Sequence, residues 1–308
     1  MKGLELCERF YETYGAPMLH AQFAPFEEII AVGLCGSGSE CFGFDDEVSR
    51  DHDFEPGFCL FLPGEDVIDR RTAFLLERAY AKLPKTFLGF ERASLSPVGG
   101  NRHGVLRMDD FFRAKVGAAD GRLTAEQWLR VPEFYLAEAT NGKVFRDDCG
   151  AFTAVREHLA HMPEDIRLKK LAGALLLMAQ SGQYNYARCL AHGEPGAAQL
   201  ALNEFVGAAL HTVFLLNRAY LPFYKWQFRA LRALPHMNSL EPGLLALLIG
   251  KAKAPAEEVD AICAAVISAL QSQELTTQTC GDLERHAYSV NDRIGDPQIR
   301  NLHILAGV

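Results

Sequence analysis

Apolar positions along this chain follow two different periods, and the change falls near its middle. In the first half, short apolar runs bounded by glycine or proline predict strands, and helical spacing predicts helices between them. The run at residues 29–34 is almost wholly apolar, so its strand is expected to be covered on both faces. The expected strands are residues 29–34, 54–62, 104–108 and 143–145, and the expected helices are residues 4–14, 66–82 and one that begins near residue 109.

After about residue 150, nearly every apolar pattern has the spacing of a helix. Turn signals separate six segments, at residues 151–161, 164–180, 182–192, 197–220, 222–234 and 256–273. The length of 308 residues is enough for two modest domains. We therefore predict an α+β fold, with a small mixed sheet and flanking helices in residues 1–150 and an all-α helical bundle in residues 151–308.

The composition narrows the classes of partner. Apolar residues make up 49% of the chain, which can fill a core, and the formal net charge is -8. Nucleic acid is not expected as a partner, because an extended nucleic-acid surface requires a basic stripe.

The segments that target proteins to other compartments are not expected here. The eight cysteines lack metal-binding spacing, and the first residues carry glutamates instead of an apolar signal core. The longest apolar stretches are shorter than a membrane span of about 20 residues. We expect a cytoplasmic protein with reduced thiols and no membrane contact.

One segment near the end of the first apolar strand has candidate chemistry. The turn Gly36-Ser37-Gly38-Ser39 is followed by Asp51-His52-Asp53 at the entry to the second apolar strand. Glycine allows backbone N–H groups to approach an anion, and serine hydroxyls donate to phosphate oxygens. Two carboxylates that are two residues apart on a strand share one face, where a divalent cation offsets their repulsion. The pattern predicts a site for a nucleoside triphosphate bound with one or two Mg²⁺ ions.

This pattern resembles the nucleotidyltransferase superfamily of the DNA polymerase beta type. The fuller string GSGSECFGFDDEVSRDHDFEPGF and the later segment LNRAYLPFYKW look like the bacterial DUF4037 family. The resemblance implies a nucleotidyltransferase core with a mixed sheet, and a helical domain that closes over the nucleotide. It also implies that ATP or another nucleoside triphosphate and a small-molecule acceptor are the partners.

The resemblance assigns roles to individual residues. Asp51 and Asp53 match the catalytic metal-binding pair, and the turn at residues 36–39 matches the phosphate-binding turn. The superfamily often has a third acid on a later strand, for which Asp109 is the best candidate and Asp110 the next. For both, capping of the following helix is an open alternative. Asp45, Asp46 and Glu47 are expected to cap or solvate their loop, and His52 to face the other side of the strand.

Basic residues in the second half form a second candidate group. Arg218, Lys225, Arg229 and Arg232 have spacings of 7, 4 and 3 residues, which places them near one helical face. Arg218 and Lys225 are expected to meet the phosphates and Tyr224 to stack on the base, although such a stripe is also typical of a solvated surface. Lys169 and Lys170 are expected at the surface. The helix junction at residues 181–186 could line an acceptor pocket.

The sequence supports three functional hypotheses in order. The first is a Mg²⁺-dependent nucleotidyltransferase that moves a nucleoside monophosphate, AMP above all, onto a small acceptor and releases pyrophosphate, with Asp109 taking the acceptor proton. The second is a catalytically weak protein of the same fold that senses nucleotides or binds a partner. The third is a metal-dependent phosphoesterase, against which the preceding glycine–serine turn argues.

Overall fold

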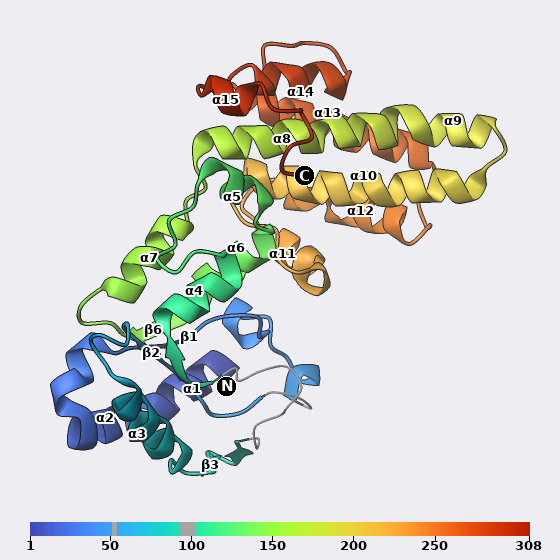
Figure 1. Cartoon of the computed structure of the whole chain (residues 1–308). Coiled ribbons are helices and arrows are strands. Elements are labelled where there is room, and N and C mark those ends of the chain that lie inside the picture. The colour runs from blue at the N-terminus through green and yellow to red at the C-terminus, as the bar shows by residue number, and fades with distance from the viewer. Residues whose placement is uncertain (51–53, 93–102) are drawn as a thin grey trace. The chain divides into compact units, whose positions relative to one another are not determined.

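The computed structural model describes residues 1–50, 54–92 and 103–308 and has an α+β architecture (Figure 1). A mixed four-stranded sheet with helices occupies the N-terminal region, and a largely helical region follows. The chain forms two compact units, which we call the sheet unit (residues 1–123 and 135–161) and the helical unit (residues 124–134 and 162–308). The division at residue 150 that the sequence suggests stays a prediction.

The sheet has the strand order β5-β2-β1-β6. Strand β1 pairs antiparallel with both β2 and β6, whereas β2 and β5 run parallel, with Leu60 opposite Val105. All four lie where the sequence predicts strands: β1 is Ala31–Leu34, β2 Cys59–Leu62, β5 Gly104–Arg107 and β6 Lys143–Arg146. The first three are shorter than predicted, and β6 is one residue longer. A short hairpin of β3 (Thr86–Phe87) and β4 (Phe90–Glu91) forms a second sheet.

Helices cover both faces of this sheet, as the buried apolar strands require. Val32, Leu60 and Leu62 share a core with the first helical segment and with α3 (Arg70–Ala81). That first segment is continuous, because a π-helical turn, η1 (Tyr11–Gly15), joins α1 (Gly3–Phe10) to α2 (Ala16–Phe23).

The other face of the sheet is closed by aromatic rings. Phe61 of β2 stacks on Phe152 at 4.0 Å between ring centroids and meets Phe111 edge-on at 5.2 Å. These rings belong to α4 (Met108–Val116) and α7 (Ala151–Leu159). Alternation along β2 therefore sends Leu60 and Leu62 to one core and Phe61 to the other.

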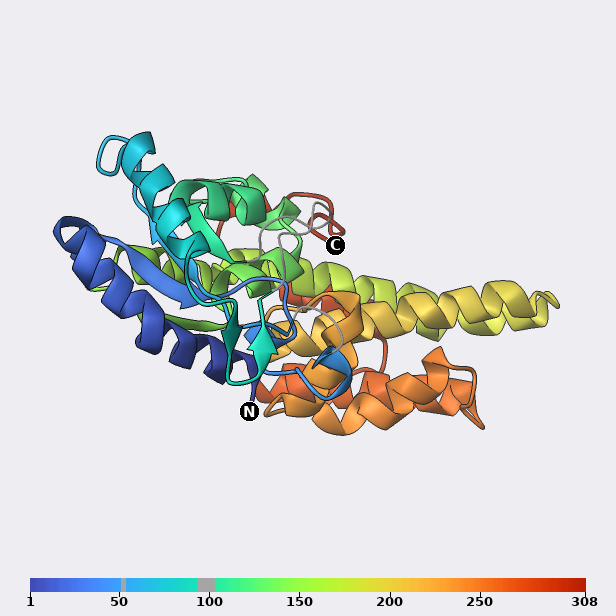
Figure 2. The same ribbon diagram turned by 90° about the horizontal axis from the view of Figure 1, so that it is seen from below.

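The helical unit is built around α8 (Glu164–Met178), of whose 15 residues 12 are buried. It continues through a π-helical segment, η5 (Ala179–Asn185), into α9 (Tyr186–Ala191), and α10 (Pro195–Leu216) returns alongside it (Figures 1 and 2). The further helices are α5 (Ala125–Arg130), α11 (Gln227–Ala233), α12 (Glu241–Leu248), α13 (Pro255–Ser272), α14 (Leu283–Asn291) and α15 (Pro297–Arg300), and α6 (Glu133–Thr140) leads from this unit into the other.

The helix α10 is long and apolar enough to cross a membrane by length and composition alone. In the described residues it is the one helix that passes this test, and 61% of its most apolar window is buried within the protein. Core helices of soluble proteins pass the same test, so the feature is weak evidence for a membrane span.

Candidate functional site

One edge of the sheet gathers the candidate phosphate turn and the entries to three strands. The antiparallel register of β1 with β2 and β6 places the end of β1 beside the beginnings of both partners. The parallel pairing of β2 with β5 adds the beginning of β5 to the same edge. The turn at residues 36–39 follows β1 directly, so the sheet presents it at this edge.

A side-chain amide holds the first residue of the turn. Gly36 N–H donates to Asn141 Oδ1 at 2.9 Å, and Asn141 Nδ2 donates to Gly36 O at 2.7 Å. Gly36 has φ +129°, a backbone conformation that favours glycine. Gly142 follows with φ +69° and donates its N–H to Cys41 O at 2.8 Å. Two long-range contacts therefore fix the corner between β1 and β6.

Two cationic side chains lie close to this corner. Arg156 is buried, and its Nη2 donates to the carbonyl oxygens of Thr140 and Asn141. Lys115 lies nearby and forms an ion pair with Glu138. Burial raises the pKa of Cys35 to about 11, although the two cations act in the opposite direction. Cys35 is therefore a neutral thiol at ordinary pH.

The turn itself presents unpaired backbone donors. Ser39 precedes a single 3₁₀ turn, η3 (Glu40–Phe42), and its carbonyl accepts from Phe42 N and Phe44 N. Among the described residues, no acceptor meets the backbone N–H groups of Ser37, Gly38 and Ser39. Successive free N–H groups at such a turn can bind an anion.

The candidate metal-binding pair, Asp51 and Asp53, lies outside the described residues, and so does His52. Phe54, the next residue, is described and contacts the first helix: a Cβ on Gly3 would lie 3.3 Å from the Phe54 ring and 2.8 Å from Glu40 Cβ. Glu40, which follows the glycine turn, and Phe54, which follows the acidic pair in the chain, therefore both lie beside Gly3.

The neighbouring acids Asp45 and Asp46 act as caps, as the sequence predicts. Asp45 is buried, and its Oδ2 accepts from Gly3 N at 2.8 Å at the start of α1. Its carboxylate also lies 3.5 Å from Lys2 Nζ. Asp46 Oδ1 accepts from Val48 N and Ser49 N at the next 3₁₀ turn, η4 (Val48–Arg50). Both carboxylates stabilise local backbone.

The structure does not bring Asp109 to the turn. It lies in the first turn of α4, just beyond the end of β5, whereas the turn lies at the beginning of β5. The four residues of β5 separate the two ends by about 13 Å. The alternative expectation that Asp109 or Asp110 caps α4 is wrong, because Arg107 is the N-cap and no side chain bonds there. Both acids are exposed, and Asp110 pairs with Arg113 at 3.0 Å.

A histidine–carboxylate pair lies at the edge that carries the turn. His103 Nδ1 is 3.3 Å from Glu55 Oε1, and both side chains are largely buried. His103 immediately precedes β5, and Glu55 lies on the approach to β2. The opposite ring nitrogen of His103 is buried without a hydrogen-bond partner. An acid and a base are therefore present at this edge, about 10 Å from the end of β1 by strand spacing.

The candidate cations belong to the helical unit, and they do not share a helical face. Arg218 follows α10 with φ +54°, and Lys225 lies in a 3₁₀ turn, η6 (Tyr224–Trp226). Arg229 and Arg232 belong to α11, which begins after that turn. The expectation of one stripe is wrong because α10 ends at Leu216, before Arg218, and a new helix begins only at Gln227.

These side chains differ in what they already contact. Arg218 Nη1 lies 2.7 Å from Glu164 Oε2, and Arg167, then Arg218, lower the pKa of Glu164 to about 2. Tyr224 is 73% exposed and packs on Phe223. Lys225 is exposed with its Nζ 5.1 Å from the Trp226 ring centroid, and within the described part of the chain it has no carboxylate partner.

The same unit contains a buried ionic cluster, which we call the Glu133 cluster. Glu133 accepts from His211 Nε2 at 2.6 Å and from Leu221 N at 3.3 Å, and lies 3.7 Å from Lys170 Nζ. Burial acts to raise the pKa of Glu133, but His211 and then Lys170 hold it below its usual range. Burial lowers the pKa of Lys170.

Lys169 and Lys170 are buried, so the prediction that they lie at the surface is wrong. The Nζ of Lys169 donates to Asn291 Oδ1 at 2.9 Å and to two backbone carbonyls, those of Arg300 and Leu302. Long side chains can bury their stems when the charged end finds acceptors. Among the described residues, no group of three or more His, Cys, Asp or Glu side chains has a geometry for metal.

Comparison with known proteins identifies one region. A family profile described as "Domain of unknown function (DUF4037)" matches residues 128–227. The chain contains a DUF4037 domain. The matched residues include the Glu133 cluster, Arg218 and Lys225, whereas the glycine turn and the Asp51–Asp53 pair lie outside the match.

No curated protein and no solved structure matches the sequence. The resemblance to the nucleotidyltransferase superfamily therefore stays a prediction.

Sequence reasoning missed several residues that build this site. Asn141 appears in the sequence only as part of an Asn-Gly turn, and its bonds to Gly36 span 105 positions. No sequence motif pointed to Arg156 or to the Glu55–His103 pair. The position of a histidine directly before a predicted strand was the available signal for His103.

Proposed function

We propose that this protein is a Mg²⁺-dependent nucleotidyltransferase that moves a nucleoside monophosphate from ATP or another triphosphate onto a small-molecule acceptor. One observation carries the proposal: the glycine turn and the entry to β2 lie at the same sheet edge, and Gly3 contacts both Glu40 and Phe54. In the chain, Asp53 and Asp51 precede Phe54 by one and three residues.

The chemistry follows from the side chains that this proposal assigns. Mg²⁺ takes oxygen ligands from one or two carboxylates and from phosphates, and Asp51 and Asp53 would supply the carboxylates. The N–H groups of Ser37, Gly38 and Ser39 would donate to the phosphate oxygens. Arg218, Tyr224 and Lys225 are the residues of the DUF4037 domain proposed to contact the nucleotide. Rate enhancement would come from positioning and charge neutralisation.

The experiment measures pyrophosphate release from Mg-ATP by the full chain in the presence of a panel of small alcohols and amines. We expect acceptor-dependent release that Asp51→Asn reduces by at least about 100-fold, because the metal would lose a ligand. Asp120→Asn is the matched control, since Asp120 is an exposed acid of the same unit. Full turnover by Asp51→Asn would refute the metal assignment.

Two further variants compare the candidate proton acceptors. If Asp109, the acid expected from the sequence, accepts the proton, Asp109→Asn lowers turnover and leaves Mg-ATP affinity unchanged. If His103 of the pair at the sheet edge accepts the proton, His103→Gln has that effect instead.

A catalytically weak nucleotide sensor or partner-binding protein is the second candidate, and one observation favours it. Asp109 and Asp110, the candidate third acids, lie at the far end of β5 from the turn. Binding of Mg-ATP by calorimetry without product from any acceptor would select this candidate.

A further inference from the structure

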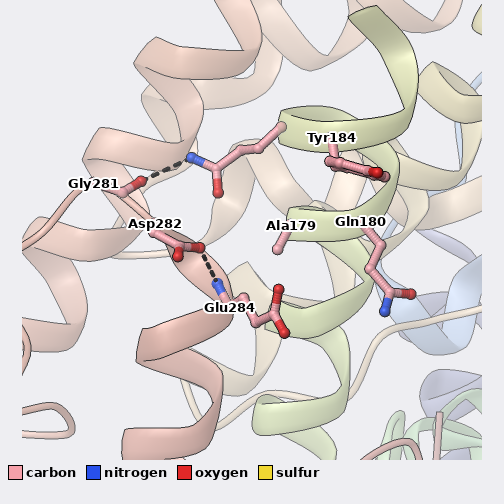
Figure 3. A pocket seen from close by; sticks show the side chains of 7 residues that line it. Ala179, Gln180, Tyr184, Gly281, Asp282 and Glu284 are labelled. Carbon is pink, nitrogen blue, oxygen red and sulfur yellow. Dashed lines mark hydrogen bonds between the residues drawn. The ribbon is translucent and has the colours of Figure 1, made fainter. Parts of the chain in front are cut away.

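The helical unit contains a pocket of about 570 Å³, which is lined in part by the helix junction at residues 181–186 (Figure 3). That this junction takes the acceptor of the proposed transfer stays a prediction. One wall is the π-helical segment η5, and the other is the beginning of α14 with the residues just before it. Its volume is within the usual range of small-molecule sites. The lining residues are Ala179, Gln180, Gln183, Tyr184, Gly281, Asp282 and Glu284.

The π-helical distortion of η5 directs its lining side chains toward the pocket. A Cβ on Gly182 would overlap the ring of Phe205, so glycine allows η5 to pack directly on α10. Ser181 Oγ donates to Leu177 O at 2.6 Å, which occupies a carbonyl within the distorted turn. Single-turn π-helical insertions often occur at functional sites, because they re-aim the side chains on the outer face. Here that face is the pocket wall.

The opposite wall is held in place without a ligand. Gln183 Nε2 donates to Gly281 O at 2.8 Å, and Gln183 Oε1 accepts from Leu283 N at 3.0 Å (Figure 3 shows the first of these bonds). His286 is fully buried behind this wall, where its Nε2 donates to Cys280 O at 2.8 Å and its Nδ1 accepts from Thr276 Oγ1. The pocket is therefore preformed, which lowers the entropy cost of binding.

The charge that the pocket offers is that of Glu284. Asp282 Oδ1 accepts from Glu284 N at 3.0 Å as the cap of α14, and Asp282 Oδ2 lies 3.6 Å from Arg285 Nε. The Glu284 side chain extends from α14 toward the helix that carries Ala179 (Figure 3), and no cation in the described chain pairs with it. The amide of Gln180 adds polar atoms to the lining but no charge, and both polar atoms of Gln183 already bond to the opposite wall.

An aromatic ring completes the site. Tyr184 is 58% exposed, and Arg188 already lies over its ring at 5.1 Å from the centroid. The ring thus attracts a cation on one face, and an alkyl chain can pack on it. A preformed pocket with an unpaired carboxylate, an aromatic ring and the small side chain of Ala179 suits a cationic group on an aliphatic stem.

We propose that this pocket binds an aliphatic primary amine, with its ammonium on Glu284 and its stem against Tyr184 and Ala179. The proposal does not rest on nucleotide transfer, so each can fail without the other.

Calorimetric titration of the full chain with diaminobutane tests this proposal, with butanediol as the uncharged analogue. We expect saturable binding of diaminobutane with a Kd of about 1 mM or tighter, and none of butanediol. Glu284→Gln should weaken binding about fivefold and Tyr184→Leu about threefold, from the loss of the charge pair and of the ring. Glu257→Gln is the matched control, because Glu257 is an exposed acid in the first turn of α13.

Three results would overturn the proposal: no saturable binding of diaminobutane, equal binding of butanediol, or an equal loss of affinity in Glu257→Gln. Far-UV circular dichroism establishes that each variant is folded. Glu284 and Tyr184 are both exposed, so either variant alone is enough to decide the outcome.

Discussion

The corner at Gly36 and the Glu133 cluster use polar residues in opposite ways. At the corner, Asn141 and Arg156 bond to backbone groups, and among the described residues no acceptor meets the N–H groups of Ser37, Gly38 and Ser39. In the Glu133 cluster, by contrast, the carboxylate contacts His211, Lys170 and a backbone N–H. The first arrangement offers donors to a ligand, whereas the second closes on itself and stabilises the fold. Charge in a sequence does not distinguish these two uses.

The largest expected effect concerns the geometry of the corner. Gly142 and Gly150 have φ values of +69° and +68°, but a Cβ on Gly142 would overlap Leu34 O, whereas one on Gly150 would meet nothing. Gly150→Ala should lower the free energy of unfolding of the sheet unit by about 1–2 kcal/mol, from backbone strain alone. Gly142→Ala should cost roughly 4 kcal/mol or more, since the backbone itself must move.

Hydrogen exchange of the β1 and β6 amides measures the unfolding free energy of the sheet unit in both variants. A cost for Gly142→Ala no larger than that for Gly150→Ala would show that the corner has room, and would remove the basis for calling it rigid.

The next effect tests whether the Glu133 cluster is structural. Glu133→Gln leaves Lys170 buried without its counter-charge and should lower the unfolding free energy of the helical unit by about 3 kcal/mol. Both tryptophans of the chain, Trp128 and Trp226, belong to this unit, so urea unfolding followed by their fluorescence reports on it. Glu126→Gln, which removes an exposed pair with Arg130, should cost no more than about 0.5 kcal/mol. Similar costs for the two variants would contradict the distinction.

A smaller effect is expected on ligand binding at the corner. Asn141→Asp keeps the acceptor for Gly36 N but replaces the donor to Gly36 O with a repulsive oxygen. The turn should shift, and Mg-ATP affinity should fall about tenfold in calorimetry. Asn203→Asp, on the exposed side of α10, is the control and should leave affinity unchanged. Unchanged affinity in Asn141→Asp would separate the corner from nucleotide binding.

The smallest effect is a pH dependence in the helical unit. The pKa of Glu164 is lowered to about 2 by Arg167 and Arg218, below its unfolded value of about 4.3. In that window the unfolded state binds more protons, so the stability from this carboxylate is present above about pH 4.3 and is lost as the pH falls toward 2. The free energy of unfolding, measured by tryptophan fluorescence across this range, should vary less with pH for Glu164→Gln than for the native chain. An identical profile would mean that the pair with Arg218 has no net effect.

The fold was more accessible from the sequence than the site was. Four strands and the helical second half were predicted at the right places, because apolar periodicity is set by which face of each element is buried. The helix near residue 109 was predicted too, but its capping by Asp109 or Asp110 was not realised, since Arg107 takes the N-cap position. The helices α2, α5, α6, α12, α14 and α15 were missed, because they are short or interrupted by polar residues.

By itself, the sequence determined the order of the strands along the chain, the glycine turn and the acids that cap its loop. These features depend on residues close together in the chain. Only the tertiary structure decided that Asn141 holds Gly36, that Lys170 is buried, and that Asp109 lies at the far end of β5 from the turn. The reason is physical: whether a polar group faces solvent or a partner depends on strand register and helix packing between distant segments, which local patterns do not specify.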